Sequence, residues 1–127
     1  MVYVHAGEPT DAGFDAFLAF CRTHKPRIRG YLTFAEGGLP TAAQRARASA
    51  DYDDFEPRRT AIVTRVLGAR PLARTFDWLR GGEWFAAFAP SDLEDARAFL
   101  GLSQDDFEAA LDAARRLSFV LGITLSR

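Results

Sequence analysis

Residues 59–64, RTAIVT, form the segment that decides the fold. Three apolar residues lie at its centre, two of them the β-branched Ile62 and Val63, and charged residues bound the segment on both sides. A short β-branched run of this kind is typical of a strand that is buried in a sheet. The rest of the chain must then supply further strands and the helices that cover them.

Strand and helix signals alternate on both sides of this segment. The other strand-like segments are short, apolar or aromatic, and bounded by glycine, proline or charge; they are residues 2–5, 27–34 and 83–88. Helix signals are caps, apolar residues at helical spacing, and glycine or proline stops. They predict helices near residues 10–25, 41–50, 71–80, 91–100 and 104–117.

This alternation favours an α/β sheet with right-handed crossovers. The chain has 127 residues and contains no repeat, low-complexity linker or composition shift, which fits one domain. We therefore predict a single α/β domain over residues 1–127, with a sheet of about four strands and alternating helices packed on it.

Charge and apolar patterning argue against two classes of partner. Sixteen basic residues offset seventeen acidic ones, so no net field draws the chain to nucleic acid. No apolar run approaches the ~20 residues that cross a bilayer, and the start MVYVHAGEPTD lacks the features of a signal peptide. We expect a cytoplasmic protein that binds no nucleic acid and does not insert into membranes.

The chemistry-bearing residues form no catalytic or metal-binding pattern. The single cysteine, Cys21, shares an apolar helix stripe with phenylalanines and leucine, where a thiol packs as core rather than reacts. The two histidines, His5 and His24, have no motif between them, and metal sites need three or four ligands. The acidic residues 51–56 lack the glycine and distal glutamate of a calcium loop and are expected to be a solvated linker. We predict no metal, no cofactor and no enzymatic activity.

The segment GGLPTAAQRARA, residues 37–48, comes closest to a functional motif. Two glycines precede a helix start, and the free amides of a helix N-terminus favour anions. A nucleoside-triphosphate loop requires lysine before its serine or threonine, and Pro40 occupies that position. Thr41 and Gln44 instead have the spacing of a capping box, so the first prediction for Thr41 is a helix N-cap.

The element order resembles that of the STAS domain, the fold of bacterial anti-sigma-factor antagonists and of related small SEC14/STAS-like proteins. Residues 27–44 are similar to the strand and loop that lead into the family's regulatory helix, and residues 85–102 to its late strand and helix. Residues 59–65 through 76–83 extend the resemblance over most of the chain. Where the family has an Asp-Ser-Ser/Thr-Gly-Leu type motif, this chain has Leu39-Pro40-Thr41-Ala42-Ala43.

The resemblance implies a non-enzymatic signalling or adaptor module that binds a protein partner such as a kinase, an anti-sigma factor or a scaffold. Its binding surface would be the loop and helix near residues 37–47, formed by Gly37, Gly38, Thr41, Gln44, Arg45 and Arg47. By position, Thr41 is the candidate for phosphorylation, which adds charge at a helix N-terminus. A homodimer through aromatics such as Trp78 or Trp84 is a further option.

A second hypothesis belongs to a different class. SEC14/STAS-like domains can hold lipids or nucleotides, and a core with eleven phenylalanines in the chain is suited to enclosing an apolar pocket. The alternative function is therefore a small-ligand binding domain.

Overall fold

The computed structural model describes residues 1–52, 58–79, 81–122 and 125, with the backbone alone at positions 52, 76, 78 and 79. Its four strands are β1 (Val2–Ala6), β2 (Tyr31–Glu36), β3 (Thr60–Thr64) and β4 (Phe85–Phe88). Its helices are α1 (Asp11–His24), α2 (Ala42–Tyr52), α3 (Ala69–Leu79), α4 (Leu93–Leu100) and α5 (Gln104–Leu121), with a 3-10 turn, η1 (Lys25–Arg27), after α1. The predicted α/β class with a four-stranded sheet is confirmed.

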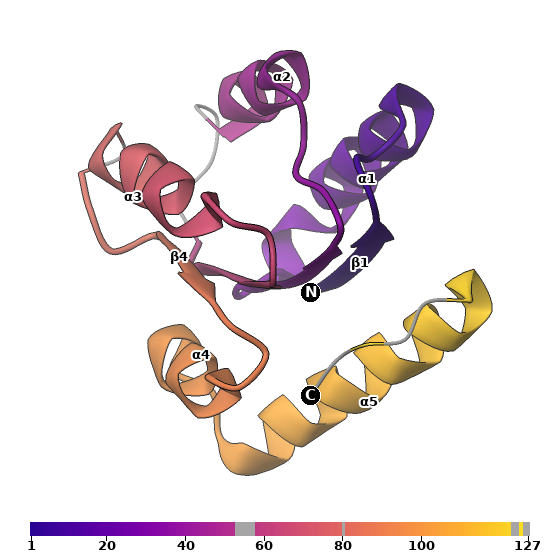
Figure 1. The fold of residues 1–127 in the computed structure, drawn as a ribbon, viewed down its shortest axis with the longest axis vertical. Coiled ribbons are helices and arrows are strands. Elements are labelled where there is room, and N and C mark those ends of the chain that lie inside the picture. The colour runs from indigo at the N-terminus through magenta and orange to yellow at the C-terminus, as the bar shows by residue number, and fades with distance from the viewer. Residues whose placement is uncertain (53–57, 80, 123–124, 126–127) are drawn as a thin grey trace.

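The order of the strands in the sheet is the order of the strands in the chain. The sheet runs β1-β2-β3-β4, and each neighbouring pair is parallel. Right-handed crossovers that all step in one direction place their helices on one face of a sheet. Accordingly α1, α2 and α3 lie on one face, while α4 and α5, which follow the last strand, lie on the other (Figure 1).

The face toward α4 and α5 is closed by a continuous apolar core. Alternate strand residues point to it, because side chains along a strand face opposite sides in turn. The buried members of this core are Val4, Leu32, Phe34, Ala61, Val63, Ala96, Phe107, Leu111 and Ala114. A large side chain buried to this degree contributes about 1.5–3 kcal/mol relative to an exposed one, so this face supplies much of the stability of the domain.

Helix α5 reaches the predicted end near Leu117 and extends beyond it. It continues to Leu121 and ends at Gly122, whose φ of +66° is the left-handed conformation that glycine adopts most readily. Its start matches the prediction, since the Ser103 hydroxyl accepts the Asp106 N–H at 3.1 Å. Of the C-terminal tail, residues 123–124 and 126–127 lie outside the described part of the chain, as do residues 53–57 of the predicted acidic linker.

The connection from α3 to β4 is organised around Asp77. Residues 81–83 all have positive φ, including Glu83 at +71°, and this left-handed run turns successive N–H groups inward. The Asp77 carboxylate accepts the N–H groups of Glu83 at 2.9 Å and Phe85 at 3.0 Å, and also that of Trp84. Desolvation acts to raise the pKa of Asp77, but the three donors outweigh it and hold the pKa below its usual range.

Asp77→Asn replaces one acceptor oxygen by an amide that faces N–H donors. We expect it to lower the free energy of unfolding by about 1–3 kcal/mol at neutral pH. The wild-type carboxylate contributes above its unfolded-state pKa of about 4, and that contribution is lost as the pH falls through the lower folded pKa. Urea unfolding at pH 7 and pH 3 should therefore show a difference that shrinks at the lower pH.

Asp112→Asn is the control for this prediction, because Asp112 is exposed and, among the described residues, pairs only with Arg115 on its own helix. We expect this substitution to lower the free energy of unfolding by less than about 0.5 kcal/mol. An Asp77→Asn protein as stable as Asp112→Asn at pH 7 would show that the carboxylate does not organise this connection.

Candidate functional site

The predicted capping box at the start of α2 is confirmed. The Thr41 hydroxyl accepts the Gln44 N–H at 3.1 Å, and the Gln44 side-chain oxygen accepts the Thr41 N–H at 3.0 Å. Both backbone groups would otherwise be unpaired at the helix N-terminus. Thr41 therefore acts as a helix N-cap.

Gln44 also joins two helices. Its side-chain amide donates to the Pro9 carbonyl at 2.7 Å and to the Asp11 carboxylate at 3.0 Å, at the start of α1. The residue is only 1% exposed. Its side chain is thus internal to the domain and does not belong to an exposed binding surface.

The remaining residues of the predicted partner surface divide between exposed and internal roles. Arg47 is exposed and pairs with Asp11 at 3.0 Å and Asp15 at 3.2 Å on α1. Gly37 is exposed with φ +83°, whereas a Cβ on Gly38 would lie 2.4 Å from the backbone nitrogen of Glu8. Glycine at 38 therefore lets the β2–α2 loop pass directly against the loop that follows β1.

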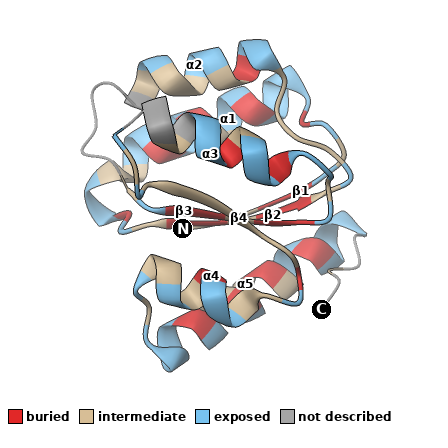
Figure 2. Ribbon diagram, turned by 60° about the vertical axis from the view of Figure 1, so that its left-hand side comes forward, coloured by how far each residue is buried: buried red, intermediate tan, exposed pale blue. Residues whose placement is uncertain are grey.

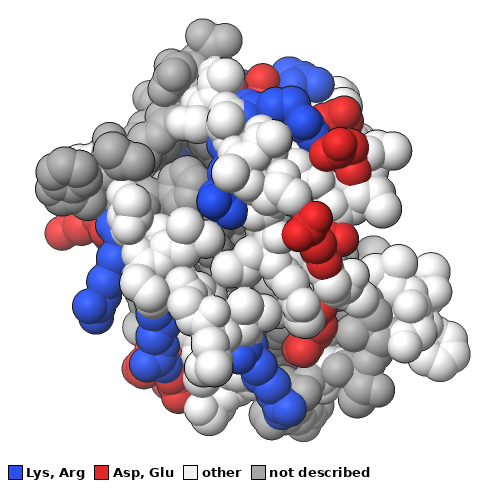
Figure 3. Space-filling model, turned by 45° about the horizontal axis from the view of Figure 1, so that its top comes forward, with Lys and Arg blue, Asp and Glu red and all other residues white. Residues whose placement is uncertain are grey.

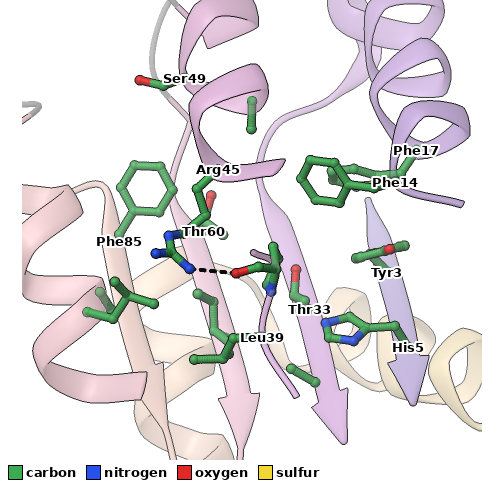
Figure 4. A pocket seen from close by; sticks show the side chains of 16 residues that line it. Tyr3, His5, Phe14, Phe17, Thr33, Leu39, Arg45, Ser49, Thr60 and Phe85 are labelled. Atoms are coloured by element: carbon green, nitrogen blue, oxygen red, sulfur yellow. Dashed lines mark hydrogen bonds between the residues drawn. The ribbon is translucent and has the colours of Figure 1, made fainter. Parts of the chain in front are cut away.

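Arg45 is half-buried and turns inward instead of toward solvent. Its guanidinium donates to the Pro40 carbonyl at 2.5 Å, which ties the first turns of α2 to the loop before it. This places the Arg45 side chain at the edge of a cavity that lies between the sheet and helices α1–α3 (Figure 4).

The cavity has a volume of about 140 Å³ and an almost wholly apolar lining. Figure 4 shows Phe14 and Phe17 on one side of it, Phe85 on the opposite side and Thr33 on the sheet between them. The wall is completed by residues of the β2–α2 loop and of helices α2 and α3; these are Leu39, Pro40, Arg45, Ala48, Ser49, Leu72 and Ala73.

The floor of the cavity is the middle of the sheet. Thr33 of β2 and Ile62 of β3 are register partners, and Tyr3 of β1 continues the same row. Thr33 and Ile62 are only half-buried, although the residues on both sides of them in their strands are buried. Figure 2 shows the reason: α2 lies farther from the sheet than α1 and α3 do, so no helix covers the centre of this face directly.

Two further polar groups face the cavity from the strands. Nδ1 of His5 lies 2.9 Å from the Gly7 carbonyl oxygen. Because a carbonyl oxygen can only accept, Nδ1 carries the proton and donates this hydrogen bond. Burial lowers the pKa of His5, and the hydrogen bond to Gly7 offsets part of that shift. The ring is therefore neutral near pH 7, with Nε2 as an acceptor. The Thr33 hydroxyl has no hydrogen-bond partner among the described residues.

Other chemistry considered from the sequence finds no support in the structure. Cys21 is buried, and desolvation raises the pKa of its thiol to about 11, so the core role predicted for it is confirmed. Within the described ranges there is no group of three or more side chains suited to holding a metal ion. Every helix of the described chain is too short or too polar to cross a bilayer.

The face shown in Figure 3 is not dominated by one sign of charge. Figure 3 shows basic and acidic side chains interspersed on the face that it presents. Trp84 is half-buried, and the side chain of Trp78 lies outside the described part of the structure.

A scan against protein-family models, a search of curated proteins and a search of solved structures each find no match to this chain. The STAS resemblance therefore stays a prediction. We therefore infer the function from the geometry of the cavity.

Reasoning from the sequence missed the residues that define this cavity. It assigned Arg45 to an outer surface and gave no role to Thr33. One available signal was a polar residue at the centre of the apolar strand YLTFAE, residues 31–36. His5 offered a second signal, as a polar residue at the end of a strand of β-branched and aromatic residues.

The position of α2 depends on Gln44, and this dependence is testable. Gln44→Leu leaves the Pro9 carbonyl and the Thr41 N–H without their partners, so we expect a loss of about 2–3 kcal/mol in the free energy of unfolding. Gln104→Leu is the matched control, because Gln104 is exposed on α5 and its side chain bonds only to Glu108 within the part of the chain that the structure describes. Urea denaturation that gives equal midpoints for the two variants would contradict the structural role of Gln44.

Proposed function

We propose that this chain binds a small apolar ligand in the cavity between the sheet and helices α1–α3. The observation that carries the proposal is the half-exposure of Thr33 and Ile62 at the centre of the two middle strands. Central strands of a parallel sheet are ordinarily buried on both faces. Here the residues of the two middle strands that face α4 and α5 are buried, so the open space is specific to the other face.

The residues that line the cavity have the chemical character of a small-molecule binding site. Binding sites for small molecules are concave and mostly apolar, with a few polar groups that fix orientation. Phenyl rings of Phe14, Phe17 and Phe85 supply the apolar walls, while Thr33 and His5 supply polar atoms on the strands. Aromatic rings in this arrangement favour a flat, apolar guest through offset or edge-on contacts.

The size of the cavity narrows the class of ligand. At about 140 Å³ it is close to the roughly 150 Å³ of an apolar protein cavity that holds one benzene. A single ring with small substituents fits this space. A whole nucleotide or a long acyl chain would extend well outside it, so we favour a compact aromatic molecule over the lipid or nucleotide considered from the sequence.

The adaptor hypothesis stays a prediction with less support from the geometry. Of the six residues assigned to the partner surface, Gln44 is buried, and Thr41 and Arg45 make hydrogen bonds inside the domain. Arg47, which is exposed, already pairs with two carboxylates of α1. We retain the proposal that the chain acts by binding and not by catalysis.

A titration with toluene tests the proposal, followed by backbone amide NMR. We expect saturable shifts of the amide signals of Thr33, Ala35 and Ile62, which belong to the cavity floor. Ala48 lines the cavity from α2, so Ala48→Phe fills the space and should abolish these shifts.

Ala46→Phe is the matched control, because Ala46 is exposed on the same helix and does not line the cavity. It should retain toluene binding within about threefold. If Ala48→Phe binds toluene as well as Ala46→Phe does, or if the wild type shows no saturable shifts on the cavity floor, the proposed function is wrong.

A further inference from the structure

The inference concerns the charged group at the cavity, the guanidinium of Arg45. Most arginines of the described chain that pair with a carboxylate do so at the surface, as Arg22 does with Asp51 and Arg70 with Asp92. Arg45 differs from Arg22 and Arg70 in two respects. It is half-buried, and no carboxylate of the described residues lies within ion-pair distance of it.

The only hydrogen bond that the described structure gives the Arg45 side chain is the one to the Pro40 carbonyl. A guanidinium has five N–H donors in a planar fork, and a single carbonyl satisfies one of them. Charged groups that leave water are costly unless an opposite charge and further hydrogen bonds compensate them. The remaining donors of Arg45 find no acceptor among the described residues, and because none of them is fully buried they stay open to a ligand.

The bond to Pro40 also holds the guanidinium in place before any ligand arrives. Pro40 and Leu39 line the same cavity and belong to the loop that Gly38 brings against the strand ends. A side chain fixed in this way loses less conformational freedom on binding than a solvated arginine does. Figure 4 shows the fork, with its bond to the Pro40 carbonyl dashed, on the side of the cavity where Phe85 lies.

We propose that the ligand is a compact aromatic monocarboxylate, with its ring between the phenyl walls and its carboxylate on Arg45. The planar fork of a guanidinium matches the two oxygens of a carboxylate. The unpartnered Thr33 hydroxyl on the floor offers a further donor to the same ligand. This inference rests on the proposed function, since it names the chemical class that the cavity selects.

The experiment compares benzoate with benzyl alcohol, which has a similar shape and no charge. Wild type is expected to bind benzoate at least about tenfold more tightly, because a hydrogen-bonded charge pair is stronger than a neutral one. Arg45→Met keeps a long, helix-compatible side chain and removes the charge. This variant should lose the preference for benzoate and retain benzyl alcohol binding within about threefold.

Arg74→Met is the matched control, because Arg74 is exposed on α3 and does not line this cavity. It changes the net charge by the same amount and should keep the wild-type preference. Urea unfolding of each variant shows that it is folded.

The experiment distinguishes a failure of the carboxylate assignment from a failure of the proposed function. If benzyl alcohol shifts the Ile62 amide signal but benzoate binds no more tightly, or if Arg45→Met keeps the preference for benzoate, the carboxylate assignment is wrong and the cavity function stands. If neither compound shifts the signals of Thr33 and Ile62, both are wrong.

Discussion

The architecture depends on a mismatch between the width of the sheet and the width of the helices that must cover it. Neighbouring strands lie about 4.8 Å apart, so four strands span roughly 14 Å. Helices that pack side by side need about 8–10 Å between axes, so three of them span roughly 16–20 Å. The strand order β1-β2-β3-β4 sends all three crossover helices to one face. The middle helix, α2, is accordingly displaced outward from the sheet.

The consequences of this mismatch differ between the two faces. On the opposite face only α4 and α5 are present, and two helices fit the available width and close the core completely. On the crowded face the space under α2 is bounded by aromatic side chains of α1 and β4 and by the β2–α2 loop. Gln44 and Arg47 hold α2 against α1, so the helix is fixed in its outward position by polar contacts instead of apolar burial. The cavity is therefore a product of topology, and its chemistry is set by the few side chains that reach it.

Local features of the chain were predictable because they depend on residues close in sequence. RTAIVT became strand β3, Thr41 and Gln44 formed the expected capping box, and Cys21 became part of the core. The cavity was not predictable in the same way. It depends on strand order and on contacts across more than thirty residues, such as that between Gln44 and Pro9. The inward turn of Arg45 depends on the Pro40 carbonyl, whose direction no helical pattern reveals.

The central claim is that α2 stands away from the sheet and leaves an accessible apolar space over its middle strands. A crystal structure determined under xenon pressure tests this most directly, because xenon enters apolar cavities of this size. The account predicts xenon density above Thr33 and Ile62, between the phenyl rings of Phe17 and Phe85 and beneath Ala48. A structure in which α2 packs directly on these two residues, with no xenon between them, would contradict it.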